Sequence, residues 1–418
     1  MSNLKPQVLR KVYGEAAQEA DERFAELEQR FSDTFGRVRK LAYFTAPGRT
    51  EIIGNHTDHN GGKILAASIT MDTIGVAATN DTSIVNINSL GYPAVSVDVS
   101  KLDEVPHCQG TLSLLAGMLK AAKMNGLEVA GFDACVSSEV IPAAGVSSSA
   151  SFEMLVCSMI DHLFNEGTAL IATYAHIGQY AENVFWEKGS GLMDQMACAV
   201  GGTILLDFSN GVKYRRLNFS YDQLGCDLVL VNTGKGHADL SQEYSSVPNE
   251  MYEVASVLDV KRLSETNEDA ILDHLLDIRQ SLKNDRAILR ALHYFEEVSR
   301  VDEAVSALSA GDKERVLDII NASGNSSWMW LQNAYVATDA EEQSIPFALA
   351  LTKIFLKGTL YGACRLHGGG FAGVIMCAVP KADSKDYVEL MGKFFGPKNV
   401  YRTNIRPIGA ARLDTMKV

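Results

Sequence analysis

The sequence has no apolar run long enough to span a bilayer, and its N-terminal residues lack the apolar segment of a signal peptide. We therefore expect a cytoplasmic protein with no membrane partner. Positive charge is also scarce, because 38 Lys and Arg residues stand against 51 Asp and Glu residues, which gives a net charge of −13. This balance argues against nucleic acid as a partner, although a small phosphate-bearing ligand needs only local positive potential.

Paired cysteines are missing as well, and the region 240–357 contains no repeat. The seven cysteines are scattered, odd in number and never spaced as C-x-x-C, so we expect buried free thiols in a reducing compartment. The Gly-Lys-Ser/Thr ending of a P-loop does not occur either. The composition, 46% hydrophobic and 21% charged over 418 residues, is that of a globular protein with about two to three domains.

Residues 46–62, APGRTEIIGNHTDHNGG, are the most informative stretch. Proline lacks the N–H that a strand needs and glycine weakens a strand, so we expect the preceding strand to end at Pro47-Gly48. The loop that follows would present His56, Asp58 and their polar neighbours to a cleft. Such groups suit the hydroxyls of a polyol or sugar, and Arg49 adds a fixed positive charge.

Two other interpretations of this loop stay open. For the loop alone, a polar turn between two strands would be the better interpretation. A metal site at His56-x-Asp58-His59 is weakly supported, because no further His or Cys stands at the spacing of zinc ligands.

Residues 141–153, IPAAGVSSSASFE, lead into an apolar helix predicted over 154–164. A small-residue loop that enters a helix gathers backbone N–H groups and the positive end of the helix dipole, which makes an anion site. Its three serines add hydroxyl donors and potential magnesium ligands. A serine N-cap with two spare serines explains the loop equally well when it is considered alone.

Two further stretches carry candidate site residues. Asp194 follows a glycine-bearing turn in 189–196, GSGLMDQM, where a pocket could hold its carboxylate, although a lone aspartate here is more often a helix cap. Glu182 falls in the second half of a helix predicted over 169–188. Three adjacent glycines in 362–379 allow the backbone to approach a ligand, and the alternative is a tight strand connection.

The remaining elements are predicted from periodicity. Phe24, Leu27 and Phe31 share one face of helical residues 5–35. Residues 74–79 and 83–89 are predicted to pair antiparallel around Asn80-Asp81. The other predicted elements are a helix over 111–125, strands over 131–136, 203–208 and 228–231, and a mostly helical region over 240–357. We place a domain boundary near residues 205–215.

Taken in this order, the stretches resemble the GHMP sugar and metabolite kinases, and within them the galactokinases. The galactokinase signature G-R-x-N-L-I-G-E-H-T-D-Y-N is matched by GRTEIIGNHTDHN at 48–60. The phosphate loop G-x-G-L-S-S-S-A is matched by AAGVSSSA at 143–150, and G-I-M-D-Q by GLMDQ at 191–195. The C-terminal glycine motif is matched by HGGGFAG at 367–373, and the S-E-Y of the second domain by Gln242-Glu243-Tyr244.

This resemblance implies an α/β (α+β) fold with two domains and the site between them. A ribosomal-S5-like domain would cover 1–210 and a ferredoxin-like domain 211–418, whose last residues could return to the first domain. The implied activity is ATP-dependent phosphorylation of galactose at the anomeric hydroxyl, giving galactose 1-phosphate and ADP, with Mg²⁺ as cofactor. The expected partners are therefore a small-molecule sugar and ATP, and we expect a monomer.

The resemblance also implies roles for individual residues. Asp194 matches the catalytic aspartate, and Arg49 matches the arginine beside the attacking hydroxyl. The matched sugar-binding positions are Asn55, His56, Asp58, Gly191 and Tyr244. The matched nucleotide-binding positions are Ala144, Gly145, Val146, Ser147, Ser148 and Ser149, and the magnesium positions are Ser149 and Glu182.

Some positions depart from the family pattern. Asn55 stands where the signature has a glutamate, so an anionic acceptor for a sugar hydroxyl becomes a neutral amide. The family's tryptophan-bearing segment near the adenine has no tryptophan here, at 107–117. Two alternatives therefore stay open: a kinase for another sugar (an arabinose, a uronic acid or an amino sugar) and a non-catalytic sensor of galactose and ATP. Such sensors lose a Ser-Ala pair that is present here as Ser149-Ala150, which favours catalysis.

Overall fold

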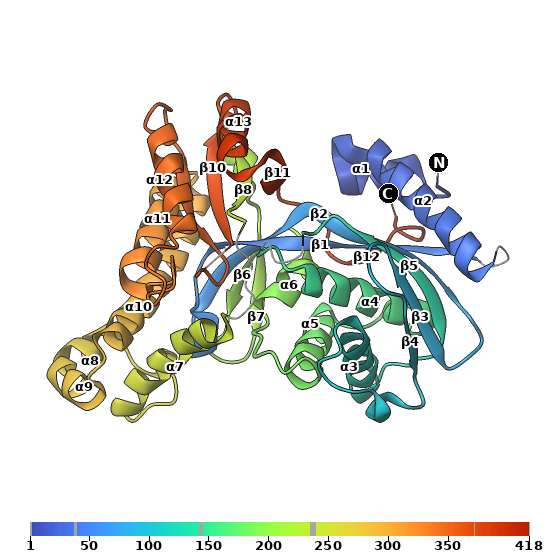
Figure 1. Ribbon diagram of the computed structural model, residues 1–418, viewed down its shortest axis with the longest axis horizontal. Helices are drawn as coiled ribbons and strands as arrows, with labels where there is room; N and C mark the ends of the chain where they lie inside the picture. Colours follow the sequence, from blue (N-terminus) through green and yellow to red (C-terminus); the bar gives the residue numbers. More distant parts are fainter. Residues whose placement is uncertain (1, 37–39, 142–144, 235–239, 372, 418) are drawn as a thin grey trace.

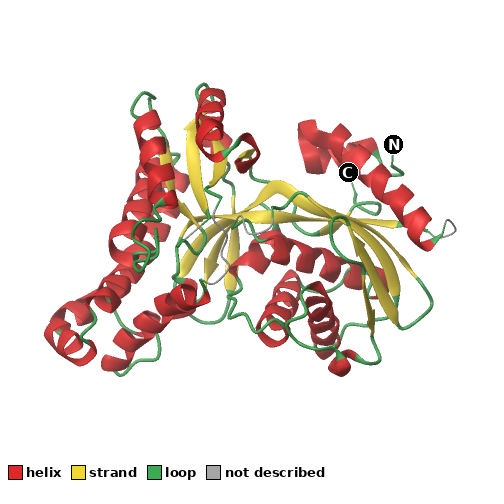
Figure 2. Cartoon of the chain, in the orientation of Figure 1, coloured by secondary structure: helices red, strands yellow, loops and turns green. Residues whose placement is uncertain are grey.

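The computed structural model describes residues 2–36, 40–141, 145–234, 240–371 and 373–417. Within these ranges the chain forms an eight-stranded sheet and a four-stranded sheet, with helices packed on both (Figures 1 and 2). The two long strands of the first sheet, β1 and β2, run across the molecule from one sheet to the other (Figure 1). The fold is therefore mixed α/β, as the sequence predicts.

The first sheet has the order β12-β1-β2-β5-β3-β4, and β6 and β7 extend it from β2. All its pairs are antiparallel except β3 with β5. The strands are β1 (Ala42–Ile53), β2 (Lys63–Thr79), β3 (Ile84–Ser89), β4 (Val95–Asp98), β5 (Phe132–Ser138), β6 (Thr203–Asp207), β7 (Lys213–Leu217) and β12 (Ala411–Arg412).

The predicted strand end at Pro47-Gly48 is wrong. Strand β1 continues through both residues to Ile53, and the register against β2 shifts between Pro47 and Arg49. Such an irregularity lets a strand accommodate a proline and a glycine, because the pairing is interrupted locally and resumes beyond them. Arg49 consequently projects from a buried strand and not from a loop.

The predicted pairing of residues 74–79 with 83–89 is also wrong. Strand β5 lies between β2 and β3, antiparallel to β2 and parallel to β3. The turn at Asn80-Asp81 exists, but Asn80 N–H donates to Gly131 O just before β5. Hydrophobic periodicity predicts where strands occur but not which strands pair. It therefore could not predict that β5, about fifty residues further along the chain, lies between β2 and β3.

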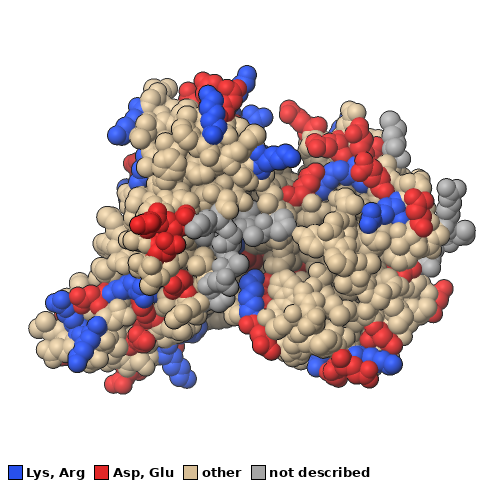
Figure 3. Space-filling view, in the orientation of Figure 1, with Lys and Arg blue, Asp and Glu red and all other residues tan. Residues whose placement is uncertain are grey.

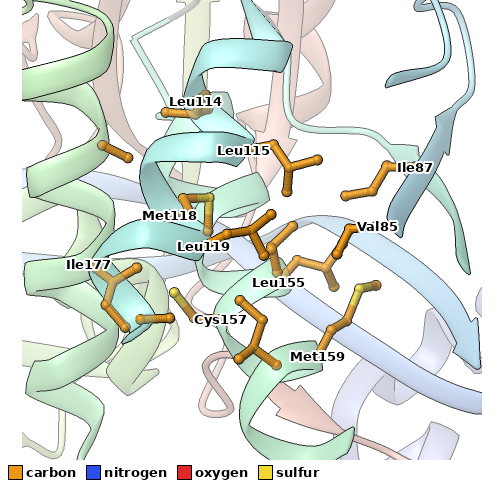
Figure 4. Packing of buried hydrophobic residues seen from close by; sticks show 14 of the residues in the cluster. Val85, Ile87, Leu114, Leu115, Met118, Leu119, Leu155, Cys157, Met159 and Ile177 are labelled. Atoms are coloured by element: carbon orange, nitrogen blue, oxygen red, sulfur yellow. The ribbon is translucent and has the colours of Figure 1, made fainter. Parts of the chain in front are cut away.

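Helices cover both faces of this sheet (Figure 1). The predicted N-terminal helical region forms α1 (Pro6–Tyr13) and α2 (Ala17–Phe35), and the predicted face of Phe24, Leu27 and Phe31 is buried on β2 and β5. The opposite face is covered by α3 (Thr111–Met124), α4 (Ser148–Phe164) and α6 (Met193–Val200), and α5 (Ile171–Tyr180) packs against these three helices. Figure 4 shows the core between these helices and the sheet, where Leu115, Leu119 and Leu155 meet Val85 of β3.

The second sheet is fully antiparallel in the order β11-β8-β10-β9. Its strands are β8 (Cys226–Asn232), β9 (Ala363–His367), β10 (Val374–Pro380) and β11 (Val400–Thr403). The helices of this half are α7 (Ser241–Val257), α8 (Glu268–Asp273), α9 (Leu275–Leu282), α10 (Asp285–Ala310), α11 (Lys313–Ser326), α12 (Ser344–Leu356) and α13 (Ser384–Phe395). The mostly helical region predicted over 240–357 is thus confirmed.

Short helical turns complete the chain. Single 3₁₀ turns are η1 (Gly14–Ala16), η2 (Asp58–Asn60), η3 (Leu102–Glu104), η5 (Tyr221–Leu224), η6 (Leu263–Glu265) and η8 (Pro397–Asn399). Two π-helical turns, η4 (Ala181–Phe185) and η7 (Ser327–Leu331), extend α5 and α11. Within the described ranges every helix is too short or too polar to cross a membrane.

The two sheets share a core and the chain crosses between them twice. Residues of β1 and β2, such as Ile52 and Leu65, pack in one cluster with Leu228 and Met376 of the second sheet. Strand β7 of the first sheet ends at Leu217, and strand β8 of the second sheet begins at Cys226. The sheets alone do not define a domain boundary, so the division at residue 210 stays a prediction. After β11 the chain returns to the first sheet, where β12 pairs with β1.

Candidate active site

An ion pair between Arg49 and Asp194 lies at the centre of the site. Arg49 comes from β1 and Asp194 from the first turn of α6, and Arg49 Nε lies 2.8 Å from Asp194 Oδ1. The Arg49 side chain is nearly buried, whereas 33% of the Asp194 side chain is exposed. Burial acts to raise the pKa of the Asp194 carboxyl, but Arg49 and the Ser147 hydroxyl hold that pKa below its usual range. The carboxylate is therefore ionised, and it lies partly exposed beside a fixed positive charge.

The predicted phosphate loop packs directly against Arg49. Arg49 N–H donates to Val146 O at 3.1 Å, and its guanidinium donates to Gly145 O. A Cβ on Gly48 would lie 2.8 Å from Val146 O, so glycine is needed for this close approach. Ala144, which was also predicted to bind nucleotide, lies outside the described residues.

The serine N-cap that this loop suggested does not form. Ser147 occupies the N-cap position of α4 with positive φ, but its hydroxyl donates to Asp194 Oδ2 and makes no capping bond. Ser148 and Ser149 begin α4, so their backbone N–H groups belong to the free N-terminal turn of the helix. Together with the helix dipole, these groups can bind an anion such as a phosphate.

The predicted magnesium positions are in contact. Ser149 Oγ donates to Glu182 Oε1 at 2.8 Å, and the ammonium of Lys188 lies 2.9 Å from the same oxygen. Glu182 lies in the π-helical turn η4, a distortion that is frequent at functional sites. A hydroxyl and a carboxylate are hard oxygen donors that suit Mg²⁺, whose remaining ligands would be water and phosphate oxygens. The donor types therefore suit the metal, and the Lys188 ammonium pairs with the same Glu182 oxygen that would bind it.

A second buried carboxylate lies behind Glu182. Gln195 Nε2 donates to Glu153 Oε2 at 3.1 Å and to Glu182 Oε2 at 3.4 Å. Burial and the neighbouring charge of Glu182 raise the pKa of Glu153 well above its usual value. Both Glu153 and Gln195 belong to motifs noted in the sequence, but their mutual contact could not be read from it.

The loop between β1 and β2, residues 54–62, carries most of the predicted sugar-binding positions; we call it the sugar loop, and it meets the turn before α6. Asp58 lies in η2, and a Cβ on Gly191 would lie only 2.3 Å from Asp58 Oδ2. Glycine at 191 therefore allows the Asp58 carboxylate to approach the segment that carries Asp194. The Asp58 side chain is 13% exposed. Asp58 and Gly191, two of the predicted sugar-binding positions, therefore lie together next to the segment that carries Asp194.

The other predicted sugar-binding residues contact the loop between β9 and β10, the glycine loop (368–370). His56 Nε2 lies 2.9 Å from Gly369 O and Tyr244 OH lies 3.0 Å from Gly370 O. Burial lowers the pKa of His56 to about 4, so its imidazole is neutral and donates to the carbonyl through Nε2. Asn55 is fully buried and bonds to Gly368 O at 2.7 Å.

His367 was not predicted as a site residue. Its imidazole is buried below the phosphate loop, and Glu51 N–H donates to His367 Nε2 at 3.3 Å, which places the proton on Nδ1. Among the described residues this Nδ1 has no hydrogen-bond partner, and a Cβ on Gly145 would lie 3.3 Å from it. Burial, with the charges of Arg49 and Arg365, lowers the pKa of His367 well below its usual value. Lys188 and Asn333 were missed as well, because neither belongs to a recognisable pattern.

Comparison with known proteins agrees with this geometry. The galactokinase galactose-binding signature matches residues 29–79, and the GHMP kinase N-terminal domain matches residues 113–202. A galactokinase of Lactococcus lactis subsp. lactis is 31% identical over 407 residues, which cover 93% of this chain and 96% of that protein. This chain belongs to the galactokinase family.

Other members and solved structures extend the comparison. A galactokinase of Streptococcus mutans is 30% identical over 385 residues, 88% of this chain and 93% of that protein. The crystal structure of Lactococcus lactis galactokinase complexed with galactose superposes with a TM-score of 0.80 at 26% identity, covering 93% of this chain and 99% of that one. L. major mevalonate kinase, at 15% identity and a TM-score of 0.60, covers 89% of this chain and 98% of its own and shares the fold. The predicted GHMP kinase fold is therefore confirmed.

Proposed function

We propose that this galactokinase-family chain transfers the γ-phosphoryl group of ATP to the anomeric hydroxyl of galactose, giving galactose 1-phosphate and ADP. Family membership and the galactose complex of the Lactococcus lactis protein support the substrate. The observation that carries the proposal is the Arg49–Asp194 pair, which lies against the loop that enters α4.

In this reaction the sugar oxygen bonds to the γ-phosphorus while the bond from that phosphorus to the β,γ-bridging oxygen breaks. The hydroxyl proton passes to Asp194. Because Arg49 holds the carboxyl pKa low, Asp194 is a weak base that orients the hydroxyl and takes its proton late in the transfer. Arg49 stabilises the negative charge that develops on the attacking oxygen.

The remaining residues position the two substrates, which is the main task in phosphoryl transfer. Residues 144–149 would bind the phosphates through the N-terminus of α4, and Asp58 would accept hydrogen bonds from sugar hydroxyls. Ser149 and Glu182 would hold Mg²⁺, which neutralises charge on the nucleotide phosphates. The proposal also includes a monomeric cytoplasmic protein, and light scattering during size-exclusion chromatography tests the first point.

A sugar panel tests the proposal. Galactose, arabinose, galacturonic acid and galactosamine are each incubated with ATP and Mg²⁺, ADP release is followed, and NMR locates the new phosphate. We expect galactose to give the highest kcat/KM and a product phosphorylated at the anomeric oxygen. Another sugar preferred by about tenfold or more would replace galactose as the substrate. Galactose binding without ADP release for any sugar would favour the sensor.

On the face in Figure 3, acidic and basic side chains are interspersed and no extended basic surface occurs. This distribution suits a small-molecule substrate and offers no footprint for a nucleic acid on that face.

A further inference from the structure

The three carbonyl groups of the glycine loop are all bound by side chains from other segments. Asn55 donates to Gly368 O at 2.7 Å, and Tyr244 donates to Gly370 O at 3.0 Å. Gly369 O accepts from both His56 at 2.9 Å and Asn333 at 3.0 Å. Four side chains therefore hold the glycine loop: Asn55, His56, Tyr244 and Asn333.

The amide of Asn55 uses all its hydrogen-bonding capacity within the protein. Its Nδ2 donates to Glu51 Oε1 at 3.0 Å as well as to Gly368 O, and its Oδ1 accepts from Asn333 at 2.9 Å and from Ser327 at 3.3 Å. An amide offers two donors and two acceptor lone pairs, and all four are occupied. Asn55 is also 0% exposed, so a sugar hydroxyl has neither a free group nor an approach.

The backbone of Asn55 is held from the second half of the chain as well. His293 Nε2 lies 3.0 Å from Asn55 O, and Glu297 Oε1 accepts from the N–H groups of Gly54 and Asn55 at 3.0 and 3.4 Å. His293 and Glu297 both project from α10. Asn55 therefore joins the sugar loop to α10, to Asn333 and to the glycine loop at one point.

A buried charge pair fixes the orientation of this amide. Arg365 lies 3.0 Å from Glu51 Oε1, and both side chains are almost completely buried. The ionised Glu51 carboxylate and the Gly368 carbonyl can only accept hydrogen bonds. The amide group of Asn55 must therefore turn its nitrogen, and not its oxygen, toward both of them. Compared with the family signature, in which positions 51 and 55 carry Asn and Glu, this chain carries Glu51 and Asn55. The carboxylate and the amide have exchanged places, and the carboxylate now pairs with Arg365.

We propose that Asn55 is a positioning residue and not a sugar ligand: it holds the glycine loop against the sugar loop, and Asp58 contacts the sugar hydroxyls in its place. The glycine loop begins beside the phosphate loop, where His367 lies against Gly145. Through this contact Asn55 sets the distance between the sugar-binding and phosphate-binding segments. The inference rests on the proposed function, because it concerns the same site.

A comparison across deoxy sugars separates the two roles. The kcat/KM of wild type, Asn55→Ala and Asp58→Ala is measured with galactose and with its 2-, 3-, 4- and 6-deoxy derivatives. A residue that binds one hydroxyl loses its effect when that hydroxyl is removed, whereas a positioning residue affects every sugar alike. We expect Asn55→Ala to lower kcat/KM by about 10- to 100-fold for all five sugars. Asp58→Ala is the matched control, and its effect should shrink with each deoxy sugar that lacks a hydroxyl bound by Asp58.

A penalty for Asn55→Ala that vanishes with a single deoxy sugar would overturn the inference. Asn333→Ala provides a second variant should Asn55→Ala fold poorly, because Asn333 bonds both Asn55 and Gly369. It should show the same uniform loss and a raised KM for ATP. If the wild-type protein does not phosphorylate galactose, the proposed function is wrong but the inference about Asn55 is still testable. The same comparison is then made with deoxy derivatives of the sugar that the protein accepts.

Exchanging positions 51 and 55 gives an independent test. Glu51→Asn alone leaves the buried Arg365 without its carboxylate, and Asn55→Glu alone places a second carboxylate beside Glu51 and a carbonyl. The double variant restores one carboxylate and one amide. We expect it to exceed either single variant by about tenfold or more in kcat/KM for galactose. A single Asn55→Glu variant with improved kcat/KM, or a double variant no better than the weaker single one, would contradict the inference.

Discussion

The Arg49 guanidinium and the Asp194 carboxylate lie 2.8 Å apart although 145 residues separate them along the chain. Strand β1 carries the arginine and the first turn of α6 carries the aspartate. The phosphate loop contributes to the same contact, because Ser147 donates to the second oxygen of Asp194. The proposed acceptor of the proton is thus tied both to the cation that supports transfer and to the loop that would hold the phosphates.

Asp194→Ala should abolish turnover while leaving the fold and most ATP binding intact. Without the carboxylate, the attacking hydroxyl loses the group that orients it and takes its proton, an effect worth about 10²- to 10⁴-fold. Turnover is measured by ADP release, and nucleotide binding by calorimetry with a non-hydrolysable ATP analogue. Asp302→Asn, at a surface pair with Lys63, is the control and should stay close to wild type. A kcat above about a tenth of wild type, a loss below about 1.4 kcal/mol, would remove Asp194 from this role.

Ser149→Ala and Glu182→Gln should each raise the magnesium concentration needed for half-maximal activity. Each substitution removes a hard oxygen donor from the pair whose oxygens lie 2.8 Å apart. The test titrates Mg²⁺ at fixed ATP and repeats the titration with Mn²⁺ followed by EPR, which reports binding without turnover. Thr168→Ala, on an exposed turn, is a control hydroxyl. Unchanged titrations in both variants would assign these residues a structural role.

The sequence predicted those parts of the molecule that short stretches determine by themselves. The helical face of Phe24, Leu27 and Phe31, the helix after the serine loop and the order of the four motifs were all readable. Strand neighbours were not, because β5 lies between β2 and β3 and only the completed sheet decides that order. The same limit applies to the site. Asn333 carries no local pattern, and His367 opens the glycine motif without any sign of its partner; both reach Asn55 and Glu51 only through the tertiary fold. Lys188 lies six residues from Glu182, but only the π-helical turn between them brings the two side chains into contact.

Acid should destabilise the protein through its buried histidines. Burial lowers the pKa of His293 in the folded state, whereas an unfolded histidine titrates near about 6.5. As pH falls below that value the unfolded state binds the proton and the folded state does not, so stability is lost toward acid. His293→Gln cannot titrate, and its free energy of unfolding should fall less steeply between pH 6.5 and 5, by up to about 1.4 kcal/mol per pH unit.

Urea unfolding at several pH values measures this slope. His274→Gln, at an exposed residue, is the control for the effect of the His-to-Gln change itself. An identical slope for His293→Gln and wild type would show that His293 does not contribute to acid sensitivity.

Arg406 should be a major stabilising contact between the C-terminal segment and the first sheet. Its guanidinium donates to Asp72 at 2.7 Å and to Thr45 at 2.8 Å, and it lies over the Tyr13 ring, with only 1% of its side chain exposed. Arg406→Met leaves the buried Asp72 carboxylate with Arg23, at 2.9 Å, as its remaining cationic partner among the described residues. Removing one partner of a buried pair is costly, and we expect a loss of about 3 kcal/mol in the free energy of unfolding.

Arg402→Met is the control from the same segment, since its side chain is 64% exposed and lies 3.7 Å from Asp227. The control should change stability by less than about 1 kcal/mol. Equal urea midpoints and slopes for the two variants would show that the return of the chain to the first sheet does not depend on Arg406.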